Sequence, residues 1–413
     1  MRQFKLALTL LAAAALASCG GGGAGDQSTA VKFSSQVSFG DSLSDVGTYA
    51  VGPIAALGGG KFTINGDNTS INPALTGKNW TELMAAQFGL PAPCAAQTGL
   101  DGGPTGFNVP VVNHAGCTSY AQGGARVTNP VGPGNKLTGA TRGDLTVPLV
   151  TQIQNHLNAV GGKFKGDEAV FVWAGADDVL MQLVGLSANA TVAATAAVTA
   201  AVPGQIQKDI AAGTCTPTDA QATNCQPAAI AELTPTVGAA AAGAYVQTNA
   251  PLAVTAMGTA GAELAGYVKS LIVANGAKYV TVVNLPDVSV TPYALTQSAD
   301  TRALITTMVT TFNNQLQTGL ADNGNVLVVD AYSVNRDQYT NPGPYGLTNV
   351  TTPACDLSPA KNPLGNALGC NATNLNPGDV SHYSYADSVH PTPFAYLLAA
   401  RYVSEKMAAK GWL

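Results

Sequence analysis

Short, continuous runs of apolar residues alternate along this chain with longer segments of helical periodicity, and this alternation restricts the fold more than any other feature. The runs that we expect to form strands are 35–39, 169–173, 279–283 and 326–329. Strands without polar alternation are typical of parallel sheets that are buried on both faces. The segments that we expect to form helices are 80–90, 145–160, 179–186, 252–274, 300–320 and 393–410. The sequence therefore predicts an α/β protein whose mostly parallel sheet is covered by helices on both faces.

The composition favours one large domain over residues 34–413, which we expect to be a monomer. Hydrophobic residues make up 46% of the chain, whereas charged residues make up only 10%, against a usual share of about 25%. The net charge of −5 argues against nucleic acid as a partner, because nucleic-acid-binding proteins carry a basic surface. Residues 187–250 are rich in Ala, Thr and Pro, and we expect an insertion that is either a lid or an exposed decoration. Residues 332–386 are expected to be mostly loop.

The N-terminus has the pattern of an export signal rather than of folded structure. Arg2 and Lys5 precede an apolar segment, 6–17, that is too short to span a bilayer. The residues before Cys19 resemble a bacterial lipobox, which implies a signal peptide over residues 1–18 and a lipidated Cys19 followed by a Gly-rich tether to residue 33. Because Gly rather than Asp follows Cys19, the resemblance implies anchoring in the outer membrane of a Gram-negative bacterium. The alternative is an ordinary signal peptide with an incidental Cys, and no transmembrane helix is expected after it.

The remaining cysteines are even in number, which favours disulfides in an exported protein. They are Cys94, Cys117, Cys215, Cys225, Cys355 and Cys370. The sequence leaves every pairing open, but pairing between neighbours in sequence would join 94 with 117, 215 with 225 and 355 with 370. There is no C-x-x-C motif, so a zinc site or a thioredoxin-like site has little support, and no metal is expected.

Two short segments at opposite ends of the chain carry the residue types of a serine hydrolase. Ser42 follows the first expected strand, in a turn where its hydroxyl would be exposed at the carboxyl end of the sheet and near the start of a helix. Asp387 and His390 are three residues apart, a spacing that lets the carboxylate reach Nδ1 while Nε2 faces a nucleophile. A hydroxyl, a base and a carboxylate that orients the base are what nucleophilic ester hydrolysis requires.

These segments resemble the two ends of the GDSL (SGNH-hydrolase) family of esterases and lipases, and two further blocks match in order. The four blocks are 39–45, 120–125, 175–178 and 387–391, with weaker matches at 79–80, 283–286 and 344–350. The resemblance covers about residues 36–412 and implies a three-layer α/β/α sandwich. It implies that Ser42 is the nucleophile, that His390 and Asp387 complete the triad, and that the amides of Ser42 and Gly123 bind the oxyanion. An ester substrate and no cofactor are expected, whereas the choice among carboxylester, lysophospholipid, polyester and sugar-acetyl substrates stays open.

Asp177 stands where the family has an Asn whose amide donates to the oxyanion. An ionised carboxylate only accepts hydrogen bonds, and beside an oxyanion it would be repulsive. Asp177 is therefore either protonated, turned away from the site, or the mark of a slow or inactive enzyme. We expect a working enzyme, and the alternative is a lipoprotein that keeps the fold as a binding module.

The other polar candidates have ordinary structural interpretations. We expect His114 and His156 to be surface or structural residues and His382 to have no metal role. Asp41 and Asp45 are expected to brace or cap the turn around Ser42, and Trp173 is expected to lie in the core.

Overall fold

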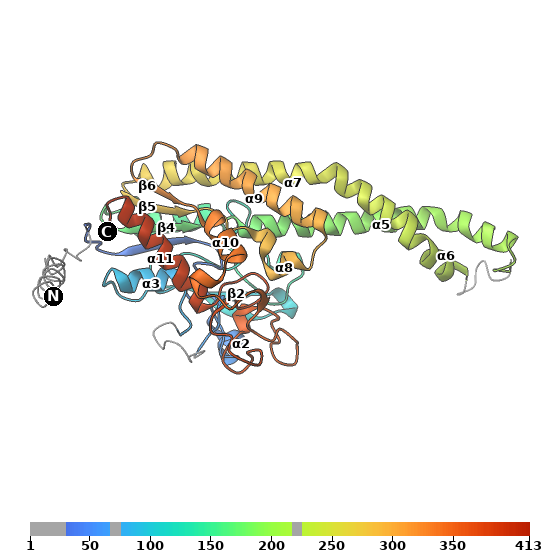
Figure 1. Ribbon diagram of the computed structural model, residues 1–413, viewed down its shortest axis with the longest axis horizontal. Coiled ribbons are helices and arrows are strands. Elements are labelled where there is room, and N and C mark those ends of the chain that lie inside the picture. Colours follow the sequence, from blue (N-terminus) through green and yellow to red (C-terminus); the bar gives the residue numbers. More distant parts are fainter. Residues whose placement is uncertain (1–29, 67–75, 217–224) are drawn as a thin grey trace, which may run out of the picture.

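A computed structural model describes residues 30–66, 76–216 and 225–413 of the chain. The signal peptide, Cys19 and most of the tether expected from the sequence lie outside these residues. The centre of the fold is a sheet of four parallel strands in the order β1-β4-β5-β6. The strands are β1 (Gln36–Gly40), β4 (Ala169–Trp173), β5 (Tyr279–Val283) and β6 (Val326–Val329). The predicted α/β class and parallel sheet are therefore confirmed, and the four expected strands form it (Figure 1).

Helices cover both faces of the sheet, which is why its strands are apolar throughout. Val170 and Val172 pack into one cluster with residues of α4 (Leu149–Ala159), α5 (Ala176–Ala211), α7 (Ala239–Tyr267) and α9 (Ala299–Leu320). Phe171 and Trp173 point to the opposite face, where α3 (Trp80–Gln87) and α11 (Pro393–Ala409) cover them. Successive side chains of a strand point to opposite faces, so both sets must be apolar.

The described part of the insertion that was expected over residues 187–250 belongs to a helical hairpin. Helix α5 is 36 residues long, and α6 (Cys225–Leu233), a π-helical segment (Thr234–Gly238) and α7 return along it. Figure 1 shows this hairpin extending well beyond the sheet. The expected helices 179–186 and 252–274 are thus too short, because an Ala-rich stretch forms helix readily even without an amphipathic pattern. Pro203 and Pro251 lie within α5 and α7 rather than ending them.

Helix α5 has an unusual surface for a helix of this length. Among the described residues it alone is long and apolar enough to cross a membrane by length and composition, and 22% of its most apolar window is buried. Its threonine hydroxyls bond back to carbonyls one turn earlier, as in the bonds of Thr191, Thr195 and Thr199. The same properties occur in helices that never enter a membrane, and α5 packs here against α6 and α7.

Smaller elements surround the carboxyl end of the sheet, and most of them were not expected from the sequence. They are α2 (Gly52–Ala56), the antiparallel pair β2 (Gln97–Asp101) and β3 (Asn108–Asn113), α8 (Pro292–Leu295), α10 (Ala331–Thr340), and the pair β7 (Asn349–Pro353) and β8 (Tyr383–Tyr385). The segment 332–386 is mostly loop, as expected, except for α10, β7 and β8.

Three disulfides join the six expected cysteines in the pattern of sequence neighbours. Cys94 pairs with Cys117, Cys215 with Cys225, and Cys355 with Cys370. Three disulfides in one chain are typical of proteins outside the cytoplasm. Within the described ranges, no group of three or more His, Cys, Asp or Glu side chains is arranged to hold a metal ion.

Candidate active site

The turn after β1 presents Ser42 at the carboxyl end of the sheet. Gly40 has a φ of +147°, and a Cβ at this position would overlap the carbonyl of Trp173 on β4, so only glycine fits. Asp41 Oδ1 accepts from Leu43 N at 3.0 Å, and Asp41 O accepts from Ser44 N at 3.1 Å. These bonds form a tight turn, as expected for Asp41. The turn does not continue into a helix, since the next helix, α2, begins only at Gly52. The helix N-terminus that we expected therefore does not act on Ser42.

Asp45 ties this turn to the segment that contains Gly123. Its Oδ1 accepts from Gly47 N at 2.8 Å and from Thr48 N at 2.7 Å, and its Oδ2 accepts from Gly123 N at 3.0 Å. The Gly123 amide is therefore already occupied, and the expectation that it donates to an oxyanion is not met in this structure. Burial raises the pKa of Asp45 to about 6, against the lowering effect of its bonds to these amides.

The amides of Ser42 and Gly124 are the free donors beside the nucleophile. Both residues line the same cavity, and no hydrogen bond from either amide is found in the described part of the chain. Gly124 has a φ of +79°, and a Cβ there would overlap the carbonyl of Pro133, so glycine is required. The bond from Gly123 N to Asp45 Oδ2 leaves the Gly124 amide, rather than that of Gly123, free.

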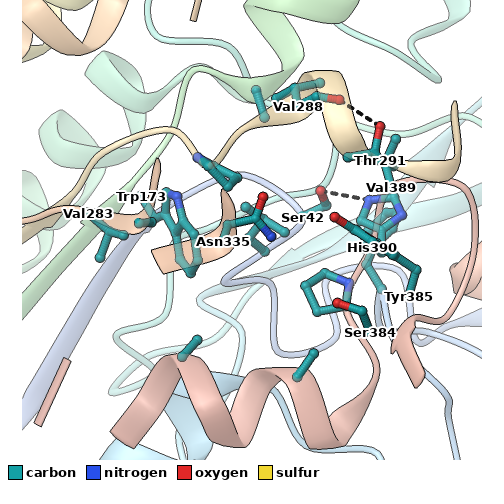
Figure 2. A pocket seen from close by; sticks show the side chains of 18 of the residues that line it. Ser42, Trp173, Val283, Val288, Thr291, Asn335, Ser384, Tyr385, Val389 and His390 are labelled. Carbon is teal, nitrogen blue, oxygen red and sulfur yellow. Dashed lines mark hydrogen bonds between the residues drawn. The ribbon is translucent and has the colours of Figure 1, made fainter. Parts of the chain in front are cut away.

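Ser42, His390 and Asp387 come together as one hydrogen-bonded chain. His390 Nε2 lies 2.9 Å from Ser42 Oγ, and His390 Nδ1 lies 2.7 Å from Asp387 Oδ2. In Figure 2, the Ser42 hydroxyl points toward the imidazole of His390. Phe62 packs against the imidazole, with 4.9 Å between the ring centroids. The structure thus brings Ser42 together with His390, which lies 348 positions later in the sequence, and with Asp387.

Asp387 is held by backbone amides as well as by the imidazole. Its Oδ1 accepts from Val389 N at 2.8 Å and His390 N at 2.7 Å, and its Oδ2 accepts from Ala367 N at 2.6 Å. Burial raises the pKa of Asp387, but the nearby imidazole and these bonds outweigh it, so the pKa lies below its usual value. The carboxylate is therefore ionised and fixed in orientation.

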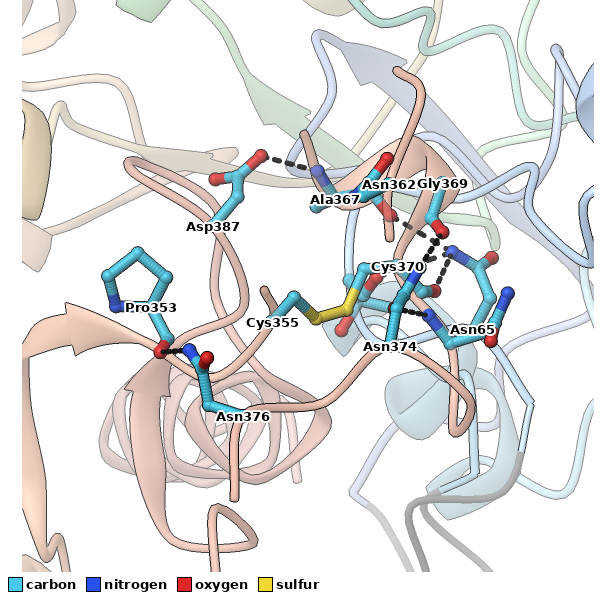
Figure 3. Close-up of a disulfide and its surroundings, with 12 residues drawn as sticks. Asn65, Pro353, Cys355, Asn362, Ala367, Gly369, Cys370, Asn374, Asn376 and Asp387 are labelled. Carbon is cyan, nitrogen blue, oxygen red and sulfur yellow. Dashed lines mark hydrogen bonds between the residues drawn. A yellow bond between two sulfur atoms is a disulfide. The ribbon is translucent and has the colours of Figure 1, made fainter. Parts of the chain in front are cut away.

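The Cys355–Cys370 disulfide fastens the loop that supports Asp387. Cys370 lies three residues after Ala367, whose amide binds the Asp387 carboxylate (Figure 3). On the other side of the bridge, Cys355 N donates to Ala386 O at 3.0 Å. The disulfide thereby connects two segments that both contact the Asp387 region.

Asp177 lies in the first turn of α5, directly after β4, and it lines the cavity with Ser42 and His390. Its side chain is buried, and Oδ2 has no hydrogen-bond partner. Burial, followed by the charges of Asp41 and Asp178, raises the pKa of Asp177 well above its usual value. The neighbouring Asp178 is instead paired, since it accepts from Arg126 Nε at 2.8 Å.

The pocket beside Ser42 is mainly apolar and has a volume of about 300 Å³. Its walls come from the carboxyl ends of the strands and from α10 and α11, and include Leu43, Trp173, Val283, Val329, Ala399 and Val403. Trp173 packs in the core, as expected, but it also faces this pocket (Figure 2). None of the described residues within 187–250 lines the pocket, so the described part of the hairpin does not cover it in this structure.

The remaining histidines have structural surroundings. His156 is buried among the rings of Phe39, Tyr120 and Phe164, and burial lowers its pKa to about 4. His114 Nε2 lies 2.7 Å from the hydroxyl of Thr98. His382 packs edge-on against Phe394.

Comparison with models of known protein families gives no match to this chain, and comparison with curated proteins gives none either.

Replacing the Cys355–Cys370 disulfide by two serines is expected to lower kcat by on the order of tenfold to a hundredfold, because the amide support of Asp387 loosens. Replacing Cys215 and Cys225, which bridge the hairpin far from the pocket, is the matched control. Both double variants should lose thermal stability, but only the first should lose turnover in the folded state. Equal kcat values for the two variants would contradict this role of the loop.

The buried carboxyls predict how stability changes with pH. Burial raises the pKa of Asp41 to about 7 and that of Asp45 to about 6, so the folded state holds these protons more tightly than the unfolded state. Their contribution to stability is full at low pH and is lost as the pH rises through about 6 to 7. Thermal unfolding should therefore give a higher Tm at pH 5 than at pH 8, and Asp41→Asn should reduce that difference. A Tm that rises over this interval would contradict the assignment.

Proposed function

We propose that this protein is a serine hydrolase of ester bonds that works through an acyl-enzyme. The observation that carries the proposal is the chain of hydrogen bonds from Ser42 through His390 to Asp387, at 2.9 and 2.7 Å. These lengths allow proton transfer between the hydroxyl and the imidazole. The GDSL resemblance in the sequence supports the same residues, and we infer that the α/β/α layers belong to the SGNH type.

The reaction follows from the positions of these groups. Ser42 Oγ attacks the ester carbonyl carbon while His390 Nε2 takes the hydroxyl proton. The tetrahedral intermediate collapses, and His390 returns that proton to the leaving alcohol. Water then attacks the acyl-serine, again giving a proton to His390, and the acid leaves as Ser42 regains its hydroxyl.

Each supporting group has one task in this sequence. Asp387 accepts from His390 Nδ1, which keeps Nε2 free to act as base and stabilises the imidazolium once it forms. The free amides of Ser42 and Gly124 are placed to donate to the carbonyl oxygen as it becomes an oxyanion.

The apolar pocket favours an acyl chain as the group that Ser42 attacks. A methylene group is about as large as a water molecule, whose share of liquid volume is about 30 Å³. A pocket of about 300 Å³ therefore holds an acyl chain of on the order of ten carbons. The three disulfides favour work outside the cytoplasm, and lipid anchoring through Cys19 would bring the pocket close to ester lipids.

A binding module without turnover is the second candidate, and the buried, unpaired carboxyl of Asp177 in the pocket is the observation that favours it. Turnover that depends on Ser42 separates the two functions.

Hydrolysis of p-nitrophenyl esters, from acetate to palmitate, by the chain without residues 1–19 is the direct test. We expect turnover that falls about 10⁴-fold or more in Ser42→Ala, because the nucleophile is lost while the fold is unchanged. Turnover by the Asp387→Asn variant should fall by a similar factor, since the imidazole loses the carboxylate that holds it in the correct tautomer and orientation. Release of p-nitrophenol is the measurement, and no turnover above the Ser42→Ala background on any ester would reject the esterase proposal.

The pocket also predicts which chain length is preferred. Ala399→Phe places a ring in the pocket, so activity on decanoate should drop while activity on acetate is kept. Ala408→Phe, on the exposed side of the same helix, is the matched control and should leave the chain-length profile unchanged. If both variants keep the wild-type preference, the acyl chain does not bind in this pocket.

A further inference from the structure

We propose that Asp177 keeps its proton at neutral pH and donates it in a hydrogen bond to the oxyanion that forms on Ser42. This inference rests on the proposed esterase function and names a third donor for the same site. The proton stays on Asp177 throughout, so the group stabilises charge and does not act as an acid.

The position of Asp177 is that of an oxyanion donor. Asp177 comes shortly after the end of β4, and Ser42 comes shortly after the end of β1. These two strands are hydrogen-bonded neighbours in the sheet. Asp177, Ser42, Gly124 and His390 all line the same pocket. A carbonyl oxygen next to Ser42 would therefore be surrounded by two free backbone amides and this carboxyl group.

Among the described residues, the two arginines that act on Asp177 are each paired with another carboxylate. Arg126 is bound to Asp178 at 2.8 Å, and Arg142 is bound to Asp144 with its Nε also at 2.8 Å. Each arginine is thus neutralised by its own partner, while Asp177 Oδ2 is buried with no partner. An isolated buried carboxylate is costly, and such a group takes up a proton instead.

The charges around Asp177 act mostly in the same direction. Asp41, Asp144 and Asp178 disfavour its ionisation, Arg126 favours it, and Arg142 and His390 also face this region. Asp41 is itself buried, with Oδ2 unpaired, and its negative charge acts on Asp177 from β1. We assign Asp41 as a positioning residue, because its charge acts on the oxyanion through the protonation of Asp177.

Protonation decides whether this side chain helps or hinders the reaction. A neutral carboxyl has one O–H donor, whereas a carboxylate has none and would repel the oxyanion. A carboxylic acid that an apolar site keeps neutral at pH 7 is an effective donor to an oxyanion in another enzyme, ketosteroid isomerase.

The pH dependence of kcat/KM tests the proposal, with p-nitrophenyl esters as the probe. Activity should fall at alkaline pH as Asp177 loses its proton, because a carboxylate no longer donates a hydrogen bond to the oxyanion. Asp177→Asn always offers an N–H donor, so the alkaline fall should disappear while activity below it stays within about tenfold of wild type. Asp177→Ala removes the donor and should cost on the order of 10²–10³ in kcat at pH values below the alkaline fall, where the wild-type side chain holds its proton. An alkaline fall that is unchanged in Asp177→Asn would overturn the proposal.

Asp41→Asn provides a second, independent readout. The amide oxygen can still accept from Leu43 N, so the turn at Ser42 is kept, but the negative charge is gone. The pKa of Asp177 should then fall, and the alkaline limb should move to lower pH without being abolished. A limb that does not move, in a variant that remains folded, would rule out the positioning role of Asp41.

An infrared spectrum separates failure of this inference from failure of the esterase function. The difference between wild type and Asp177→Asn at pH 7 should contain the carbonyl band of a protonated carboxyl group, and this signal needs no substrate. A missing band overturns the inference even if Ser42-dependent turnover is present. A band without any turnover rejects the esterase function and the donation to an oxyanion, and leaves Asp177 only as a neutral buried acid.

Discussion

The parallel pairing of β1 with β4 is the contact on which the site depends, because it places two loop segments side by side at one edge of the sheet. The register aligns Gly40 with Trp173, and no side chain can stand at position 40 without overlapping β4. Ser42 leaves β1 two residues later, and Asp177 leaves β4 four residues later, so the nucleophile and the buried acid meet at the same pocket.

The buried carboxyl groups near this edge differ in how their charge is compensated. Asp387 is held by three backbone amides and an imidazole, and Asp178 and Asp144 are each paired with an arginine. Asp45 accepts hydrogen bonds from three backbone amides. Asp177 has none of these partners. An uncompensated buried group lowers the stability of the fold, and proteins keep such groups at functional positions. This contrast, more than burial itself, distinguishes Asp177 from its neighbours.

Much of the fold and the triad could be predicted from the sequence, because strand hydrophobicity and the Ser42 and Asp387-to-His390 patterns are local signals. The predictions were wrong where the structure depends on features that a local sequence pattern does not contain. The Ala-rich helices of the hairpin show no amphipathic period, since most of their surface is exposed. The choice between Gly123 and Gly124 depends on a bond to Asp45 across 78 residues, which no local pattern contains. The prediction of a helix after Ser42 was wrong because Asp41 and Asp45 stabilise a turn instead. Their side chains accept hydrogen bonds from backbone amides that a helix would have used.

Neutral amide side chains, rather than charged ones, hold the C-terminal loop next to Asp387. Asn65 Nδ2 donates to the carbonyls of Ala367 and Cys370, and Asn374 Nδ2 donates to that of Gly369, so neutral amides hold the loop that supports Asp387 (Figure 3). A lysine or arginine in these positions could hold the same carbonyls, but its charge would act on Asp387 and on the imidazolium that forms at His390. Neutral donors fix the backbone without adding charge. The electrostatic potential at the triad is then set by Asp387, His390 and the amides that face them. The amide side chains of this loop therefore support the ionised Asp387 without adding a charge of their own beside it.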